Sequence, residues 1–127
     1  MRGETTPRIL VVEDESDTAR AIQRLLERRL GVLVDIAVDG KRARECMLSN
    51  EYDLITLDYQ LPDCDGLELL RELSEMTKPP PVVLVTGHGD EHVAQKAFDL
   101  GAVGYVLKDE RMLEVLASTA KKALVQA

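Results

Sequence analysis

Five short apolar runs alternate along the chain with five longer segments in which apolar and polar residues are mixed. The runs cover residues 8–12, 32–37, 53–57, 82–85 and 103–107. They are rich in Val, Ile and Leu and too short for ordinary helices, which is typical of strands buried on both faces. The pattern therefore predicts five buried strands.

The segments between these runs repeat apolar residues at the three-and-four spacing of a helix. The first helix is expected over residues 18–30, with Ser16 or Asp17 as its N-cap and Gly31 as its C-terminal stop. The other four are expected after the turn at residues 38–40, from near Asp65 to before Lys78, from Asp90 to Gly101, and from about Glu110 to Leu124. Met76 and Phe98 are assigned to the buried stripes of the third and fourth helices.

Strict alternation of apolar strands and amphipathic helices predicts a parallel sheet with helices on both faces. Right-handed crossovers then give a doubly wound, three-layer α/β/α sandwich of five strands and five helices. The length of 127 residues suits one domain over 1–127, in which residues 1–7 are expected to be a flexible tail.

Composition narrows the functional classes. With 45% hydrophobic and 31% charged residues the chain is expected to be globular, and its net charge of -7 disfavours direct nucleic-acid binding by this domain. No apolar run approaches the ~18 residues of a membrane span, and no signal peptide is evident. Cys46 and Cys64 lack metal-type spacing and read as reduced thiols, so a cytoplasmic location is expected.

Reactive side chains stand where the predicted strands end. Because parallel strands share one carboxyl edge, these residues are expected to lie close together. They are Glu13 and Asp14 after the first strand, Asp58 after the third, Thr86 after the fourth and Lys108 after the fifth.

The chemistry of these residues suits a site that accepts a phosphoryl group. Clustered carboxylates repel one another unless a cation neutralises them, and Mg²⁺ prefers such oxygen ligands. A carboxylate such as Asp58 can also attack phosphorus to give an aspartyl-phosphate. A lysine and a hydroxyl would then stabilise the charge on the transferring group.

Four motifs in order resemble the receiver domain of two-component response regulators, over essentially the whole chain. They are ILVVEDE at 9–15, Asp58 followed by LPDCDG at 61–66, VTG at 85–87 and GAVGYVLK at 101–108. The resemblance implies a flavodoxin-like sheet with strand order 2-1-3-4-5. It also implies that a histidine kinase or histidine phosphotransfer protein phosphorylates Asp58, and that the domain catalyses only its own phosphoryl transfer and dephosphorylation.

The same resemblance assigns roles around Asp58. Glu13, Asp14, Asp58 and the main-chain carbonyl of Gln60 would surround Mg²⁺. Thr86 and Lys108 would contact the phosphoryl oxygens. Tyr105 would change rotamer with Thr86, so that the face of the fourth helix, fifth strand and fifth helix controls an output domain or partner protein. A phosphorylation-dependent dimer is one arrangement that this allows.

Three positions depart from the family pattern. Glu13 stands where Asp is more frequent, and Asp109 rather than Pro follows Lys108, so the usual cis peptide lacks the support of proline. His88 lies beside the site. No other metal-ligating residues are expected near His88 and His92, and both histidines are expected to be exposed.

Two other classes of function compete with this interpretation. The first is a phosphorylation-independent receiver that acts as a protein-interaction module, for which Glu13 and the missing Lys-Pro pair are mild support. The second is a flavin binder or phosphatase on a similar sandwich. It is disfavoured because the first strand–helix loop is acidic and Gln60 stands where a phosphatase would need a second Asp.

Overall fold

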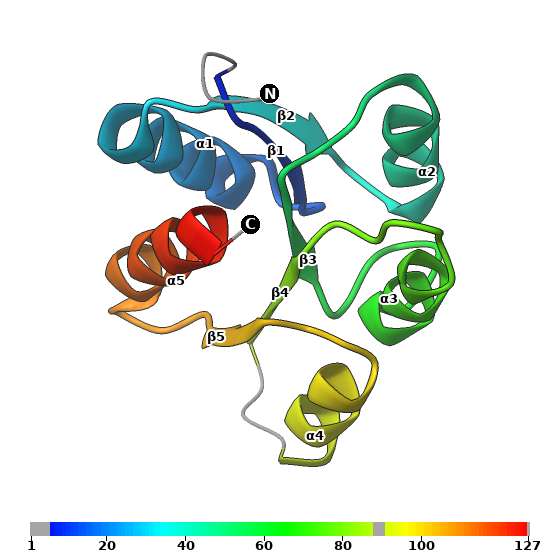
Figure 1. Cartoon of the computed structure of the whole chain (residues 1–127). Helices are drawn as coiled ribbons and strands as arrows, with labels where there is room; N and C mark the ends of the chain where they lie inside the picture. Colours follow the sequence, from blue (N-terminus) through cyan, green and yellow to red (C-terminus); the bar gives the residue numbers. More distant parts are fainter. Residues whose placement is uncertain (1–5, 88–90, 127) are drawn as a thin grey trace.

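Strands and helices alternate along the chain in the computed structural model, which describes residues 6–87 and 91–126 (Figure 1). The strands are β1 Arg8–Val12, β2 Leu33–Ala37, β3 Leu54–Asp58, β4 Val82–Thr86 and β5 Gly104–Leu107. The helices are α1 Ser16–Leu30, α2 Gly40–Ser49, α3 Gly66–Ser74, α4 Glu91–Asp99 and α5 Met112–Gln126. In the part of the chain that is described, no helix is long and apolar enough to cross a membrane.

The strands form one parallel sheet with the order β2-β1-β3-β4-β5. Helices α1 and α5 cover one face of the sheet, and α2, α3 and α4 cover the other (Figure 1). The expected doubly wound, three-layer α/β/α sandwich with five helices is therefore confirmed. Because all strands run the same way, their carboxyl ends meet at a single edge.

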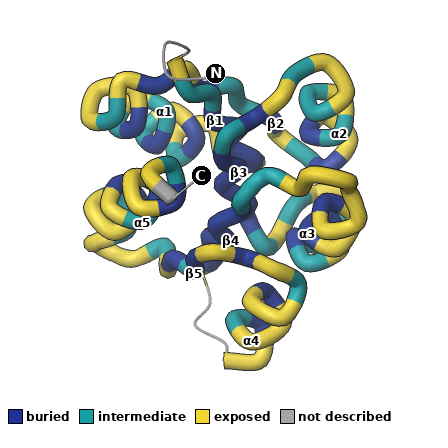
Figure 2. Tube along the Cα trace, viewed as in Figure 1, coloured by how far each residue is buried: buried dark blue, intermediate teal, exposed yellow. Residues whose placement is uncertain are grey.

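Each face of the sheet has its own apolar core, because successive strand residues point to opposite faces. In β1, Leu10 and Val12 join the core under α2, α3 and α4, whereas Ile9 and Val11 join the core under α1 and α5. Figure 2 shows the buried strands as a dark centre and the outer helix surfaces as exposed. Every residue of β3 is buried, Asp58 included.

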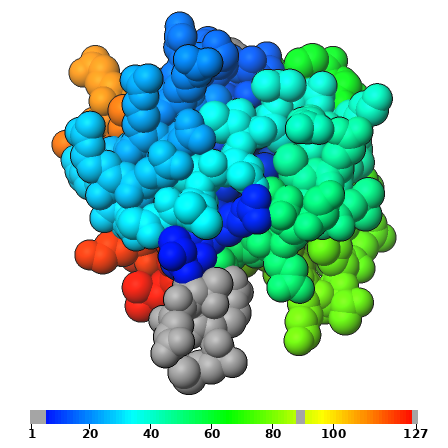
Figure 3. Space-filling view, turned by 90° about the horizontal axis from the view of Figure 1, so that it is seen from above, coloured from blue at the N-terminus to red at the C-terminus, as the bar shows by residue number. Residues whose placement is uncertain are grey.

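Strand β2 forms one edge of the sheet and lies between α1 and α2, as the view from above shows (Figure 3). The segment before β1 is tied to this edge, since the Pro7 carbonyl accepts a hydrogen bond of 2.9 Å from the Leu33 N–H. Pro7 is therefore part of the sheet margin. The first five residues of the expected tail lie outside the described residues.

Some expected helix boundaries and core positions are wrong. Glu15, rather than Ser16 or Asp17, is the N-cap of α1, and its side chain makes no cap hydrogen bond. Helix α3 ends at Ser74, which leaves Met76 44% exposed beyond it. Phe98 is 49% exposed because α4 buries a narrow stripe of Val93 and Ala97, and Phe98 lies one position further around the helix.

The other boundaries follow the sequence closely. Gly31 ends α1 in the left-handed conformation at φ 62°, as expected, and its N–H donates to the Glu27 carbonyl. The Asp65 side chain caps α3 by accepting the Glu68 N–H. Asp90, the expected cap of α4, lies outside the described residues.

A substitution at Gly104 can test how tightly α5 packs on β5. A Cβ at Gly104 would lie 2.6 Å from the Thr119 methyl carbon and 3.3 Å from Val83. We predict that Gly104→Ala lowers the free energy of unfolding by about 1–3 kcal/mol through overpacking, measured by urea denaturation. Thr119→Ser removes that methyl group and should recover part of the loss. Gly87→Ala is the control, since nothing lies within 4 Å of its Cβ position, and should change stability by less than about 0.5 kcal/mol.

Candidate functional site

Three carboxylates meet at the carboxyl edge of the sheet. One oxygen each from Glu13, Asp14 and Asp58 lies within 4.8 Å of the others. Glu13 is only 2% exposed and Asp58 only 5%, whereas Asp14 is exposed. The expected cluster of acidic residues is therefore present, with two of its members withdrawn from solvent.

Strand register brings these residues together. Val12 of β1 pairs with Leu57 of β3, so the residues that follow, Glu13 and Asp58, emerge side by side. The Glu13 N–H extends the pairing with β2 by donating to the Ala37 carbonyl at 2.9 Å. The Glu13 side chain is fixed in turn, because its Oε2 accepts the Glu15 N–H at 3.0 Å.

Lys108 supplies the positive charge. Its Nζ lies 2.6 Å from Glu13 Oε1 and 3.1 Å from Asp58 Oδ2, so one ammonium group contacts both buried carboxylates. The backbone of Lys108 is held to β4 by its N–H, which donates to the Thr86 carbonyl at 2.8 Å. The peptide bond between Lys108 and Asp109 is trans.

Burial dominates the electrostatics of Glu13. It raises the pKa of the Glu13 carboxyl above its ordinary value, although hydrogen bonds from Lys108 and from the Glu15 N–H act in the opposite direction. Burial by itself would lower the pKa of Lys108. The hydrogen bond to Glu13 and the charges of Asp58 and Glu13 outweigh burial, and the net pKa of Lys108 is raised.

The loop after Asp58 closes the site on one side. The Gln60 N–H donates to Asp58 Oδ1 at 3.3 Å, which places the Gln60 backbone beside the acidic cluster. A shallow hollow opens here to solvent, and Gln60 is one of the residues around it. The hollow is lined by Glu13, Asp14, Glu15, Asp58, Gln60, Leu61, Pro62, Gly87 and Lys108.

Thr86 and Tyr105 do not line this hollow, although Gly87, the residue after Thr86, does. Thr86 is 1% exposed and pairs with Leu107 of β5, and Tyr105 pairs with Leu84 two residues earlier. Residues two apart in a strand share a face, so the side chains of Thr86 and Tyr105 point to the same side of the sheet. Tyr105 is half-buried there, against the core under α4.

The residues present fit a hard divalent cation. Mg²⁺ takes oxygen ligands from one or two carboxylates and keeps several waters. Glu13, Asp14 and Asp58 offer three carboxylates around a hollow that reaches solvent, with the Gln60 backbone beside them. His88, expected beside the site, lies outside the described residues.

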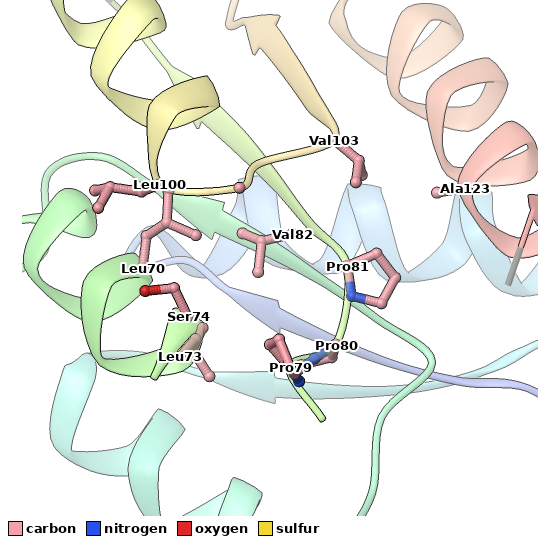
Figure 4. Close-up of a pocket in the computed structure, with 11 residues that line it drawn as sticks. Leu70, Leu73, Ser74, Pro79, Pro80, Pro81, Val82, Leu100, Val103 and Ala123 are labelled. Carbon is pink, nitrogen blue, oxygen red and sulfur yellow. The ribbon is translucent and has the colours of Figure 1, made fainter. Parts of the chain in front are cut away.

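A larger pocket lies at the opposite end of β4 and has a different character (Figure 4). Its walls are apolar apart from Ser74, and no charged side chain of the described residues lines it. One wall of the pocket is formed by Pro79, Pro80 and Pro81, which directly precede β4. Within residues 6–87 and 91–126, this pocket therefore offers no titratable side chain for chemistry, in contrast with the hollow at the carboxyl edge.

Aspartate at position 63 suits a turn or a helix cap, and its hydrogen-bond partners lie far away along the chain. Both of its carboxylate oxygens accept N–H groups at the start of α2, from Gly40 at 2.8 Å and from Lys41 at 2.9 Å. No local pattern signals this contact, because donor and acceptor are separated by more than twenty residues of sequence.

Known proteins resemble this chain over most of its length. The family model of the response regulator receiver domain matches residues 9–120. The response regulator ArlR of Staphylococcus saprophyticus is 40% identical over 87% of this chain and 49% of its own length. The transcriptional regulatory protein DltR of Streptococcus agalactiae is 36% identical over 94% of this chain and 55% of its own. The chain thus spans about half the length of these relatives.

The fold has close counterparts among solved structures. A two-component response regulator from Clostridium difficile superposes with a TM-score of 0.87 at 27% identity, and the match covers 95% of this chain and 98% of that one. The likeness therefore includes the whole sandwich.

The raised pKa of Glu13 leads to a pH-dependent prediction. A carboxyl with a raised folded-state pKa destabilises the fold above that pKa, and its effect disappears as the pH falls below the unfolded value of 4.5. We predict that Glu13→Gln raises the free energy of unfolding at pH 7.5 with a metal chelator present, and that this gain shrinks toward pH 4.5.

Urea denaturation across this pH range measures the effect. Glu27→Gln, at an exposed position of α1, is the matched control and should change stability by less than about 0.5 kcal/mol. A Glu13→Gln variant that is less stable than the parent at pH 7.5 would show that the bond to Lys108 outweighs burial.

Proposed function

The chain belongs to the response regulator receiver domain family, the signalling module of two-component systems, and from this premise we propose that Asp58 is its phosphoacceptor. The phosphoryl donor would be a sensor histidine kinase or a histidine phosphotransfer protein. The observation that carries the proposal is the contact of one ammonium group, on Lys108, with the two buried carboxylates of Glu13 and Asp58.

The transfer needs a nucleophile and a means of holding charge. An Asp58 oxygen forms a bond to phosphorus while the bond from phosphorus to the donor nitrogen breaks, and the electron pair leaves with that nitrogen. Lys108 already lies 3.1 Å from Asp58, where it can hold negative charge on the phosphoryl oxygens. Thr86, at the end of the neighbouring strand β4, is the proposed hydroxyl contact.

Mg²⁺ is the proposed cofactor, and it would neutralise charge on the cluster and on the phosphoryl group. Glu13, Asp14, Asp58 and the Gln60 carbonyl are the groups that would hold it. The Glu13 side chain is longer than the Asp more frequent in the family, and it is engaged with Lys108 and the Glu15 N–H. Asp14, which is exposed at the rim, is free to approach a cation from solvent.

A partner would recognise the phosphorylated state through the face formed by α4, β5 and α5. Phosphorylation adds about 1.5–2 negative charges next to β4. Thr86 would move toward them, and Tyr105, on the same side of the sheet, would take a new rotamer. Each of these elements has an exposed apolar side chain that is available to a partner: Phe98 of α4, Leu107 of β5 and Val115 of α5.

The wider role follows from the relatives. Because the chain spans about half of their length, we propose that it controls an output domain or a partner protein. The domain itself would act in the cytoplasm, away from membranes, and would not bind nucleic acid directly. Its net charge of -7 supports the last point.

Phosphorylation can be tested with a small donor. We predict that incubation with Mg²⁺ and acetyl phosphate adds the mass of one phosphoryl group, and that Asp58→Asn abolishes the gain. Lys108→Ala should slow the reaction by about 100-fold, because it removes charge stabilisation from the transition state. Intact-mass spectrometry with peptide mapping gives the readout, and Asp99→Asn on the exposed surface of α4 is the control.

The same experiment addresses the alternative of a phosphorylation-independent interaction module. If neither acetyl phosphate nor beryllofluoride modifies or binds the chain in the presence of Mg²⁺, the phosphoacceptor proposal is wrong and that alternative holds.

The proposed face of α4, β5 and α5 leads to a prediction about assembly. Beryllofluoride with Mg²⁺ should shift the chain from monomer to dimer in sedimentation velocity, because the proposed movement of Thr86 and Tyr105 would change this face, whose exposed apolar residues favour association. Leu107→Glu on β5 should prevent the shift. Leu48→Glu is the matched control, since Leu48 is 88% exposed on α2, away from this face. An equal effect of both substitutions would contradict the assignment of the face.

A further inference from the structure

The loop between β3 and α3 is fastened to the start of α2 by one side chain. The Asp63 carboxylate accepts the Gly40 N–H at 2.8 Å with Oδ1 and the Lys41 N–H at 2.9 Å with Oδ2. These hydrogen bonds hold the pKa of Asp63 below its ordinary value. The contact joins two loops and uses both oxygens of an exposed carboxylate. Asp63 therefore satisfies these two N–H groups at the start of the helix in place of water.

Helix α2 already has a cap of its own. Asp39 is its N-cap residue and accepts the Arg42 N–H at 2.7 Å. Asp63 therefore bonds different N–H groups of the same helix end, and it does so from the loop that follows the reactive strand. A contact of this kind positions the loop as much as it caps the helix.

The surfaces on both sides of the contact are close-packed. A Cβ at Gly40 would lie 2.5 Å from Cys64 Sγ and 3.3 Å from Asp63 Oδ1, so glycine allows the loop to approach. A second bridge runs parallel to the first, between α2 and α3. Arg44 donates two hydrogen bonds to the Glu72 carboxylate, at 2.9 Å and 2.7 Å.

The anchored loop is also closed within itself. The Leu61 N–H donates to the Cys64 carbonyl at 3.2 Å, and the Gly66 N–H donates to the Tyr59 carbonyl at 2.5 Å. Gln60 and Asp65 pair as an isolated antiparallel bridge. The Tyr59 N–H also donates to the Val85 carbonyl at 3.0 Å, which fastens the start of the loop to β4. Because the internal bonds tie the rest of the loop together, the contact of Asp63 with α2 restrains its far side.

We propose that Asp63 is a positioning residue of the phosphoryl site, which holds the 59–66 loop against α2 and so keeps the Gln60 backbone beside Asp58. The inference rests on the proposed function, because it assigns the Gln60 carbonyl to the bound cation. Asp63 touches neither the cation nor the phosphoryl group, and it acts through the loop alone.

Asp63→Ala tests the anchor, and Asp39→Ala is its matched control. Both substitutions remove a carboxylate from the same end of α2, but only Asp63 belongs to the loop. Amide hydrogen exchange in metal-free buffer should become faster at Leu61 and Gly66 in Asp63→Ala and stay unchanged there in Asp39→Ala. This readout needs neither metal nor phosphodonor. Unchanged exchange at both amides in Asp63→Ala would overturn the inference.

The functional consequence is measured as Mg²⁺ affinity by titration calorimetry on the full chain. Asp63→Ala should weaken Mg²⁺ binding by about tenfold, the size of effect typical of groups that orient metal ligands. Asp39→Ala should leave the affinity within about twofold of the parent. Equal losses in the two variants would mean that Asp63 only caps the helix, and the inference would fall.

Gly40→Ala perturbs the contact from the other side without changing the loop sequence. Its added methyl should push against Cys64 and weaken Mg²⁺ binding, and Cys64→Ala in the same chain should restore the affinity. Failure of the parent chain to bind Mg²⁺ would refute the proposed function, whereas normal Mg²⁺ binding by Asp63→Ala would refute only the positioning role.

Discussion

Crowding of like charge at the carboxyl edge of the sheet is the constraint on which the rest of this structure depends. Glu13 and Asp58 are almost fully buried, and their oxygens lie within 4.8 Å of each other and of Asp14. Repulsion between carboxylates is strong where solvent cannot screen it. Lys108 contacts both buried members and compensates part of that charge. Because the three carboxylates outnumber the one ammonium group, the site favours binding of a further cation. It is also sensitive to any group that competes for Lys108.

The sheet makes this crowding unavoidable. Parallel pairing places Val12 beside Leu57, Asp58 beside Val85, and Thr86 beside Leu107, so the ends of four strands are aligned in space. Two apolar cores, one on each face, hold those strands in place. The free energy that keeps the carboxylates together therefore comes from burial of the apolar side chains of the strands and helices.

The loops that follow the strands then refine the geometry. Glu13 is oriented by the Glu15 N–H, and the segment after Asp58 is closed by hydrogen bonds within itself and anchored to α2. Asp63 has this role although it lies outside the hollow and is exposed to solvent. Substitutions at such positions can alter the site without touching the reactive carboxylate.

Periodicity alone was enough to predict the alternation of strands and helices, because buried parallel strands and amphipathic helices leave distinct patterns in the sequence. The residues at the strand ends, Asp58 among them, followed from the rule that parallel strands share a carboxyl edge. Local patterns could not show that Phe98 would be exposed, since the width of a buried stripe depends on what packs against the helix. Nor could they show the partners of Asp63 or the bridging position of Lys108. Those contacts join residues from separate loops and strands, and only the tertiary structure brings them within bonding distance.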